Sequence, residues 1–277
     1  MDKQKLNTYL GSLNVPEPPP PTLESLRHLQ AAHLARYAFQ SLSTVLGEPV
    51  SLAEDDIFRK TVQENWGGYC YELNLLFAAL LQSLGFAVRP LTGSIVHDNR
   101  PDMPHARTHL MLEVKAAGDA WLVDVGFGGL NPTAPLRLED RGSQLTPHGA
   151  YRIEEYAGSL VLSAQTGQEW RMLYRFDLQP QFMPDLEVGN WYVSTHPKSP
   201  FRTRLMAARA TPNGERHTLL NRRYTLRRAD GSAEHAELPD ARAVLAVLHE
   251  QFLLAADRLA EPKLQVFLDS LEQASKA

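Results

Sequence analysis

The chain contains a single cysteine among its 277 residues, so no disulfide can form within it. Closely spaced metal ligands are also lacking. Without a second thiol, a zinc site would need a set of histidines and carboxylates that no spacing in this sequence suggests. We therefore expect no metal. The one thiol, on Cys70, is either a small buried apolar side chain or a reactive group.

Long apolar runs and a surplus of one charge are missing too. No segment approaches the roughly 18 apolar residues of a membrane span, and residues 1–5 are not followed by the apolar stretch of a secretion signal. The 28 Lys and Arg residues face 32 Asp and Glu residues, a net charge of −4 with no basic stripe. These absences predict a cytoplasmic protein that binds neither membrane nor nucleic acid. They leave open whether it is a monomer or a homodimer.

The segment 64–85 is the one around which the chain is organised. Gly67 and Gly68 predict a tight turn, and Gly85 predicts the end of a helix. Cys70 then lies at or near the helix N-terminus, where free N–H groups and the helix dipole favour a thiolate. The helix is predicted from apolar residues at i, i+3, i+4, i+7, i+8 and i+11, namely Leu73, Leu76, Phe77, Leu80, Leu81 and Leu84.

Helices are also predicted on the N-terminal side of this segment. Residues 3–13 read as a short helix, and prolines between positions 16 and 21 impose an extended connector. Thr22 offers an N-cap for a second helix that runs toward Tyr37. We therefore predict a helical unit over residues 1–85.

Strand patterns begin after Gly85. A polar loop at 97–102 and turn signals at Gly118 and Thr166-Gly167 separate runs of β-compatible residues. Residues 86–185 are therefore predicted to form a small antiparallel sheet or barrel. The expected strands are 86–96, 109–114, 121–125, 151–153, 160–162 and 170–176.

The second and third of these strands are predicted to form a hairpin. If the apolar residues at 110, 112 and 114 share a face with those at 121 and 123, we expect paired positions to sum to 233. His109 would then lie directly opposite Asp124, at a distance at which a carboxylate can hold an imidazole N–H.

The last part of the chain, 186–277, is predicted to be a mixed α/β unit. Residues 201–210 and 216–226 read as strands separated by the turn signal Asn213-Gly214. Two helices are expected after them, from apolar stripes at Leu245, Leu248 and Phe252 and at Leu264, Phe267, Leu268 and Leu271.

Cys70, His109 and Asp124 together supply the parts of a catalytic triad. The thiolate would attack a carbonyl, the imidazole would accept or return a proton, and the carboxylate would orient the imidazole and stabilise its charged form. The spacing does not show that Cys70 meets His109. Without that contact, His109 is an ordinary strand histidine and Asp124 a carboxylate near a turn. The glycines at 126–129 could let backbone N–H groups approach a phosphate, or could simply end a strand.

Four segments in this order and spacing resemble the arylamine N-acetyltransferases. They are Gly-Gly-Tyr-Cys-Tyr-Glu-Leu-Asn at 67–74, Thr-His-Leu-Met-Leu at 108–112, Val-Asp-Val-Gly-Phe-Gly at 123–128 and His-Pro-Lys-Ser-Pro-Phe at 196–201. Ala-Phe-Gln-Ser-Leu at 38–42 fits the same family. The resemblance thus extends over essentially the whole chain.

The resemblance implies an α+β, multi-domain fold with a cysteine-protease-like Cys-His-Asp core. An N-terminal helical bundle, a central antiparallel β-barrel and a C-terminal α/β lid would occupy 1–85, 86–185 and 186–277. It implies that acetyl-CoA acetylates Cys70, and that the acetyl group then passes to an aromatic amine or hydrazine. It implies His109 as the base and Asp124 as the orienting acid, coenzyme A near Thr108, Gly126, Phe127, Gly128 and Phe201, and an acceptor pocket lined by Phe39, Tyr69, Phe127 and Phe201.

The sequence departs from the family pattern at two positions. Trp66 stands where the family usually has arginine, and Gln40 stands where it usually has glutamate. Because both charges are missing together, no unpaired buried charge remains, and we interpret the pair as a replaced structural contact.

Two other functions are compatible with the same motifs. An amide synthase of the same fold would keep the triad but act on a polyketide thioester. A non-catalytic relative would only bind coenzyme A or an aromatic ligand. Cysteine proteases and transglutaminases share the order Cys, His, Asp, but the surrounding motifs fit them less well.

Overall fold

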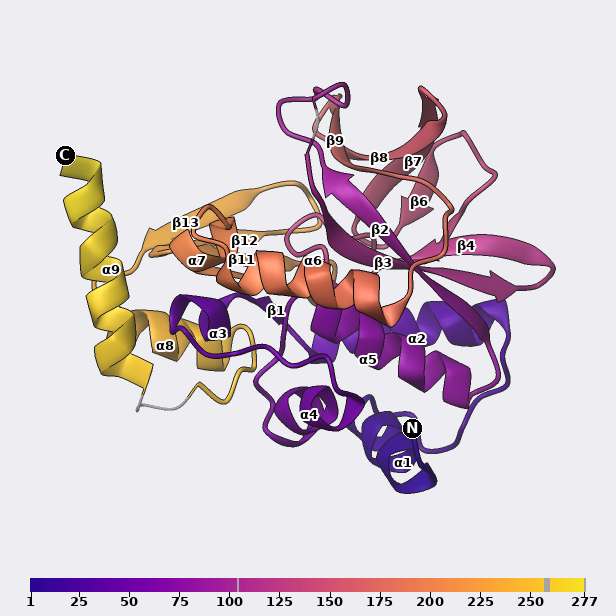
Figure 1. Ribbon diagram of the computed structural model, residues 1–277, viewed down its shortest axis with the longest axis horizontal. Helices are drawn as coiled ribbons and strands as arrows, with labels where there is room; N and C mark the ends of the chain where they lie inside the picture. Colours follow the sequence, from indigo (N-terminus) through magenta and orange to yellow (C-terminus); the bar gives the residue numbers. More distant parts are fainter. Residues whose placement is uncertain (104, 257–259, 277) are drawn as a thin grey trace.

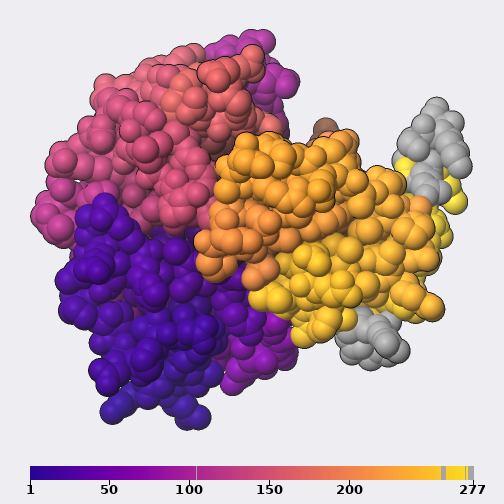
Figure 2. Space-filling model, turned by 180° about the vertical axis from the view of Figure 1, so that it is seen from behind, coloured from indigo at the N-terminus to yellow at the C-terminus, as the bar shows by residue number. Residues whose placement is uncertain are grey.

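The computed structural model describes residues 1–103, 105–256 and 260–276. Helices from the N-terminal part lie beneath a strongly curved sheet, and a second sheet with its own helices lies beside both (Figure 1). Seen from behind, the three parts adjoin one another along the chain from indigo through pink to yellow (Figure 2). The α+β class predicted from the sequence is confirmed.

The N-terminal helices begin where the sequence provides caps. The carboxylate of Asp2 accepts a hydrogen bond from the Lys5 N–H, and the Thr22 hydroxyl accepts one from the Ser25 N–H. Both predicted helices are present, and two short ones between them and Cys70 were not predicted. The elements are α1 (Lys3–Ser12), α2 (Leu23–Arg36), α3 (Leu42–Val45), α4 (Glu54–Phe58), a π-helical turn η1 (Arg59–Gln63) and α5 (Cys70–Ser83).

Helix α5 is the central helix of this layer. Its predicted apolar stripe is buried, and it packs against strands of the curved sheet (Figure 1). Gly85, just beyond its C-terminus, has φ of 90°, the left-handed conformation expected of a terminating glycine. Cys70 is the first residue of the helix, as predicted.

The curved sheet has eight antiparallel strands and forms the barrel-like part of the molecule. Its strand order is β5-β4-β3-β2-β9-β8-β7-β6, and its concave side encloses an apolar core that includes Leu91, Met111, Leu162 and Tyr174. The strands are β2 (Ala87–Ile95), β3 (Arg107–Ala116), β4 (Asp119–Val123), β5 (Leu136–Arg137), β6 (Gln144–Thr146), β7 (Gly149–Tyr156), β8 (Ser159–Thr166) and β9 (Glu169–Phe176).

The predicted hairpin is present as β3 and β4, but its predicted register is wrong by two residues. Leu112 pairs with Val123, so paired positions sum to 235 rather than 233. The turn sets this register: Ala117 and Gly118 both have positive φ, 52° and 83°, which is the two-residue turn that matches the twist of a hairpin. A two-residue shift keeps every side chain on its predicted face, but it removes the predicted pairing of His109 with Asp124, which follows the last residue of β4.

The C-terminal sheet recruits a strand from the N-terminal part. Strand β1 (Phe39–Gln40) pairs with β10 (Met206–Ala210), and β11 (Arg216–Leu220), β12 (Arg223–Arg227) and β13 (Ala233–Glu237) continue the sheet. The sheet is accompanied by the helices α6 (Met183–Thr195), α7 (Pro200–Thr203), α8 (Ala241–Glu250) and α9 (Glu261–Lys276).

Two strand predictions in this region are wrong in their bounds, and the helices α6 and α7 were not predicted. Residues 201–210 are not one strand, because Pro200 begins the short helix α7 and β10 starts only at Met206. Residues 216–226 are two strands, β11 and β12, separated by a turn at Asn221, whose φ is 55°. Helix α6 escaped prediction because Val188 and Trp191 are exposed, which blurs its apolar stripe.

Three apolar clusters hold the molecule together. The largest joins the N-terminal helices to one face of the β3–β4 hairpin, a second fills the barrel, and a third joins α8 and α9 to Ala38 and Leu42. The boundaries predicted at residues 85 and 185 stay a prediction. Within the described residues, no helix is both long enough and apolar enough to cross a membrane.

Gln40 and Trp66 are in direct contact. The Gln40 amide donates to the backbone carbonyl of Trp66 at 3.1 Å, and the Trp66 indole N–H donates to Ser43 Oγ at 3.1 Å. The other end of the Gln40 amide accepts from the N–H of Leu42, at the start of α3. A neutral network therefore joins these two positions, in agreement with a replaced structural contact.

We expect Trp66→Ala to destabilise the protein by about 2 kcal/mol. The half-buried indole packs against the apolar cluster that contains α8 and α9, and it donates a hydrogen bond to Ser43. Trp191→Ala is the matched control, since that indole is 62% exposed. Urea unfolding followed by circular dichroism measures both. Equal midpoints for the Trp66 variant and the unmodified protein would contradict a structural role for Trp66.

Candidate active site

Cys70 lies at an N-terminus that is built around a buried ion pair. The Glu72 carboxylate accepts from the Tyr69 backbone N–H at 3.2 Å and so caps α5. Lys60 neutralises the same carboxylate at 2.6 Å from the preceding turn. Cys70 itself is buried, with 2% of its surface exposed, and its Sγ lies 3.8 Å from the carbonyl oxygen of Thr108 on β3.

The three residues predicted as a triad are brought together. His109 Nε2 lies 2.7 Å from Asp124 Oδ2, and both side chains are buried. Cys70 and His109 line the same cavity, and Cys70 is among the groups that raise the pKa of the imidazole. Because Asp124 occupies Nε2, the Nδ1 atom of His109 is left for the sulfur. His109 and Asp124 are not the cross-strand partners that the sequence predicted. His109 pairs with Gly93 in the sheet, and only the two side chains meet.

The electrostatic environment keeps His109 charged at neutral pH. Burial by itself would lower the pKa of the imidazole, but the negative charge of Asp124, the hydrogen bond to it and the contact with Cys70 raise the pKa to about 10. The charged imidazole can give its proton to a leaving group beside the Cys70 sulfur. The site can therefore present a nucleophile and a proton donor at the same time.

Asp124 is fully buried and accepts hydrogen bonds on both oxygens. Asn74 Nδ2 donates to Oδ1 at 3.1 Å, and Tyr174 donates its hydroxyl hydrogen to Oδ2 at 3.1 Å. The Gly126 N–H adds a bond to Oδ1 at 2.9 Å. The backbone carbonyl of Asp124 accepts from Gln30 on α2 at 3.2 Å. The orientation of this carboxylate is therefore fixed from three sides.

Sequence reasoning missed these supporting residues. Asn74 stood within the motif at 67–74, one helical turn beyond Cys70 and so on its face of α5, which is a signal that could have been used. Tyr174 and Gln30 carried no such signal, because their contacts with Asp124 depend on how β9 and α2 pack.

Gly126 allows the loop after β4 to approach α5. A Cβ atom at this position would lie 2.6 Å from Cys70 Cα and 2.8 Å from Asn74 Nδ2, which is closer than atoms can pack. The glycine is therefore required for the close approach of backbone to backbone that puts Asp124 beside the start of the helix.

Cys70 and His109 open onto a cavity of about 550 Å³. Phe39 and Phe201 form part of its wall, with ring centroids 6.0 Å apart, and Phe127 lies 5.2 Å from the His109 ring. Tyr69 does not line the cavity: it packs behind Phe201, and its hydroxyl bonds Asn190. The other residues that were predicted to contact coenzyme A or the acceptor do line the cavity. They are Phe39, Thr108, Gly126, Phe127, Gly128 and Phe201.

Several lining residues were not predicted from the sequence. Exposed Arg204 and the exposed, edge-packed pair His97 and His105 lie on its wall, and Tyr192 of α6 lines it as well. Arg204 brings positive charge to the cavity. Within the described part of the chain, no group of three or more His, Cys, Asp or Glu side chains is placed to hold a metal ion.

Comparison with known proteins gives consistent matches over nearly the whole chain. A family model described as N-acetyltransferase matches residues 22–260. The chain is 37% identical over 252 residues to the arylamine N-acetyltransferase of Escherichia coli K12, covering 91% of this chain and 89% of that protein. It is 40% identical to the arylamine N-acetyltransferase of Mycolicibacterium smegmatis, covering 89% and 90%.

Solved structures agree with the sequence matches. The Mycobacterium marinum arylamine N-acetyltransferase, solved in complex with CoA, superposes with a TM-score of 0.89 at 39% identity, covering 96% of this chain and 99% of that one.

We expect Asp124→Asn to slow alkylation of Cys70 by iodoacetamide about ten-fold or more at pH 7. Without the carboxylate charge, burial dominates and the pKa of His109 falls, so the sulfur loses its imidazolium partner. In the unmodified protein the rate should stay nearly constant from pH 7 to 9, because His109 remains protonated below its pKa of about 10.

The control for this experiment is Asp177→Asn, an aspartate that pairs with Arg107 outside the triad. As Cys70 is the only cysteine, mass spectrometry reports its labelling directly. Circular dichroism checks that each variant is folded. Equal rates in the two variants would show that Asp124 does not act on the sulfur through His109.

Proposed function

The chain belongs to the arylamine N-acetyltransferase family and is an acetyltransferase, and from this we propose a two-step transfer through an acetyl group on Cys70. The donor is acetyl-CoA, and the acceptors are aromatic amines and hydrazines. The observation that supports this proposal most directly is that Cys70 and His109 line one aromatic cavity, with the buried Asp124 carboxylate hydrogen-bonded to His109 behind it.

In the first step the Cys70 thiolate attacks the thioester carbonyl carbon of acetyl-CoA. The bond from that carbon to the coenzyme A sulfur breaks, and the leaving thiolate takes the proton of the His109 imidazolium. Donor and product are both thioesters, so the acetyl group moves between two similar sulfur leaving groups. His109 is left neutral and ready to act as a base.

In the second step the amine nitrogen attacks the acetyl carbon on Cys70. His109 accepts a proton from the nitrogen, the amide forms, and the Cys70 thiolate leaves, which restores the starting ion pair. Asp124 supports both steps, because its charge and the hydrogen bond to Nε2 hold the imidazole in one orientation.

The lining of the cavity suits both substrates. Phe39, Phe127 and Phe201 offer flat apolar surfaces against which an aromatic amine can stack. Apolar walls also exclude water, which favours transfer to the amine over hydrolysis of the acetyl group. The Gly126–Gly128 loop and Thr108 lie on the same cavity and are the proposed contacts of coenzyme A.

Intact-protein mass spectrometry tests the two steps separately. Brief incubation with acetyl-CoA should add one acetyl group, and adding an arylamine such as anisidine should remove it. Cys70→Ala should gain no acetyl group, because the nucleophile is gone. An acetyl group that persists in Cys70→Ala, or no adduct on the folded protein, would contradict the proposal. Absence of an adduct would also favour the amide synthase or a non-catalytic binder.

We expect Arg204→Gln to raise KM for acetyl-CoA about three- to ten-fold and to change kcat little. The Arg204 guanidinium is exposed at the cavity, where a phosphate group of coenzyme A can reach it. Arg202→Gln is the matched control, because Arg202 is exposed on α7 but does not line the cavity. Equal KM values for the two variants would exclude a phosphate contact at Arg204.

A further inference from the structure

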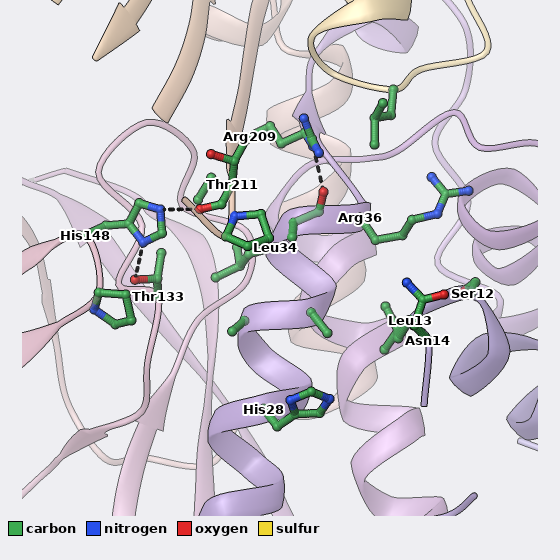
Figure 3. A pocket seen from close by; sticks show the side chains of 17 residues that line it. Ser12, Leu13, Asn14, His28, Leu34, Arg36, Thr133, His148, Arg209 and Thr211 are labelled. Atoms are coloured by element: carbon green, nitrogen blue, oxygen red, sulfur yellow. Dashed lines mark hydrogen bonds between the residues drawn. The ribbon is translucent and has the colours of Figure 1, made fainter. Parts of the chain in front are cut away.

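A second cavity, of about 570 Å³, lies between α2, the turn after α1 and the turn from β10 to β11 (Figure 3). It shares no lining residue with the cavity at Cys70. None of its lining residues is acidic, and two of them, Arg36 and Arg209, carry a permanent positive charge. The cavity is therefore cationic and separate from the candidate active site.

The described contacts of these charges are with neutral groups: Arg36 lies over the Tyr37 ring, 5.2 Å from its centroid, and both guanidinium groups donate to uncharged oxygens. Arg209 donates from Nε to the carbonyl of Ala35 at 2.6 Å and from Nη1 to that of Gln251 at 3.0 Å. Arg36 donates from Nη1 to the Asn65 side chain at 2.5 Å. Among the described residues, no carboxylate lies within ion-pair distance of either guanidinium. Nη2 of Arg209 and Nη2 and Nε of Arg36 keep N–H groups that no described residue accepts.

The two arginines also repel each other. Partial burial lowers the pKa of Arg209 from its ordinary value, and the nearby charge of Arg36 lowers it further. An anion between the two guanidinium groups would relieve this repulsion and accept their free N–H groups.

The remaining walls are mostly apolar. Ala31, Ala32 and Leu34 of α2 line the cavity together with Pro147 and Pro212. His148 lines it as well (Figure 3). Burial lowers the pKa of His148, and the charge of Arg216 lowers it further. Its Nε2 donates to the Thr211 carbonyl at 2.9 Å, and its Nδ1 lies 2.9 Å from Thr133 Oγ1, so the imidazole is neutral and already bonded.

We propose that this cavity binds a small amphipathic carboxylate, with its carboxylate on Arg36 and Arg209 and its apolar body against the alanine and proline walls. The planar guanidinium matches a carboxylate in geometry as well as in charge. Apolar walls favour a monoanion with a ring or branched chain over a compact, strongly hydrated dianion. The volume lies in the range of small-molecule sites.

Binding can be tested on the full chain with 4-bromobenzoate as the probe. We expect saturable binding by isothermal titration calorimetry and an anomalous bromine peak in crystals, located between α2 and the β10–β11 turn. The neutral isostere 4-bromobenzamide should bind at least about ten-fold more weakly, because it lacks the charge that the two arginines recognise. Inorganic phosphate should not compete at equal concentration.

Three variants identify the groups that recognise the probe. Arg36→Gln and Arg209→Gln should each weaken binding of 4-bromobenzoate about ten-fold. Arg27→Gln should leave it unchanged, because Arg27 is an exposed arginine of the same helix that does not line the cavity. Arg36 makes fewer hydrogen bonds than Arg209, so its variant remains informative if Arg209→Gln does not fold.

The results that would overturn the proposal are equally specific. They are the absence of saturable binding, equal affinity for acid and amide, a bromine peak only in the cavity at Cys70, or unchanged binding in folded Arg36→Gln. Displacement of the probe by phosphate would instead assign the cavity to a compact oxyanion. None of these outcomes depends on acetyl transfer, so the proposed function and this proposal can fail separately.

Discussion

The candidate site depends on one constraint: Asp124 is a fully buried carboxylate, and a buried charge is tolerated only when hydrogen bonds replace the water it has lost. The donors that satisfy it come from different elements, namely Asn74 of α5, His109 of β3 and Tyr174 of β9, together with the N–H of Gly126. Satisfying this carboxylate therefore joins the helical layer to the barrel. It also fixes where the imidazole can stand relative to Cys70.

The sequence predicted α1, α2 and α5 because local chemistry determines their ends. Thr22 caps α2, and Gly85 ends α5 in the left-handed conformation, as expected. The hairpin register was harder, because both faces are buried: Leu112 packs on the helices and Met111 inside the barrel. Because neither face of the hairpin is polar, the pattern of apolar residues does not distinguish one pairing of the strands from another. The Ala117-Gly118 turn determines the register instead.

The sequence predicted Cys70 at a helix start and His109 on a strand, but it placed Asp124 within the next strand, which ends at Val123. The spacing alone did not predict that the three residues meet. Cys70 and His109 are far apart in the sequence, and only the packing of α5 on β3 brings them together. Tyr69 lies next to Cys70 in the sequence, but its hydroxyl bonds Asn190 and it is not among the residues that line the cavity, so its predicted contact with the acceptor stays a prediction. The cavity wall from α6 and α7 could not be foreseen, since neither helix was predicted.

The arginines of this fold differ in how many of their N–H groups have hydrogen-bond acceptors within the protein. An arginine whose N–H groups are all bonded has a structural role, whereas one with unbonded N–H groups can bind a ligand. Arg216 is buried and donates to the carbonyls of Gly129, Asn131 and His148 and to the Tyr151 hydroxyl. Its terminal nitrogens thus have oxygen partners within the protein, although no carboxylate contributes. Such an arginine is a cross-link, and it needs no ligand.

Arg209 lies on the neighbouring strand and is only half-buried, and its Nη2 has no acceptor among the described residues. Arg36 bonds a single side chain. The two cavities meet different parts of β10: Met206, Ala207 and Ala208 line the cavity at Cys70, whereas Arg209 and Ala210 line the second cavity. One strand thus separates an aromatic cavity from a cationic one, and each can be selected for its own ligand.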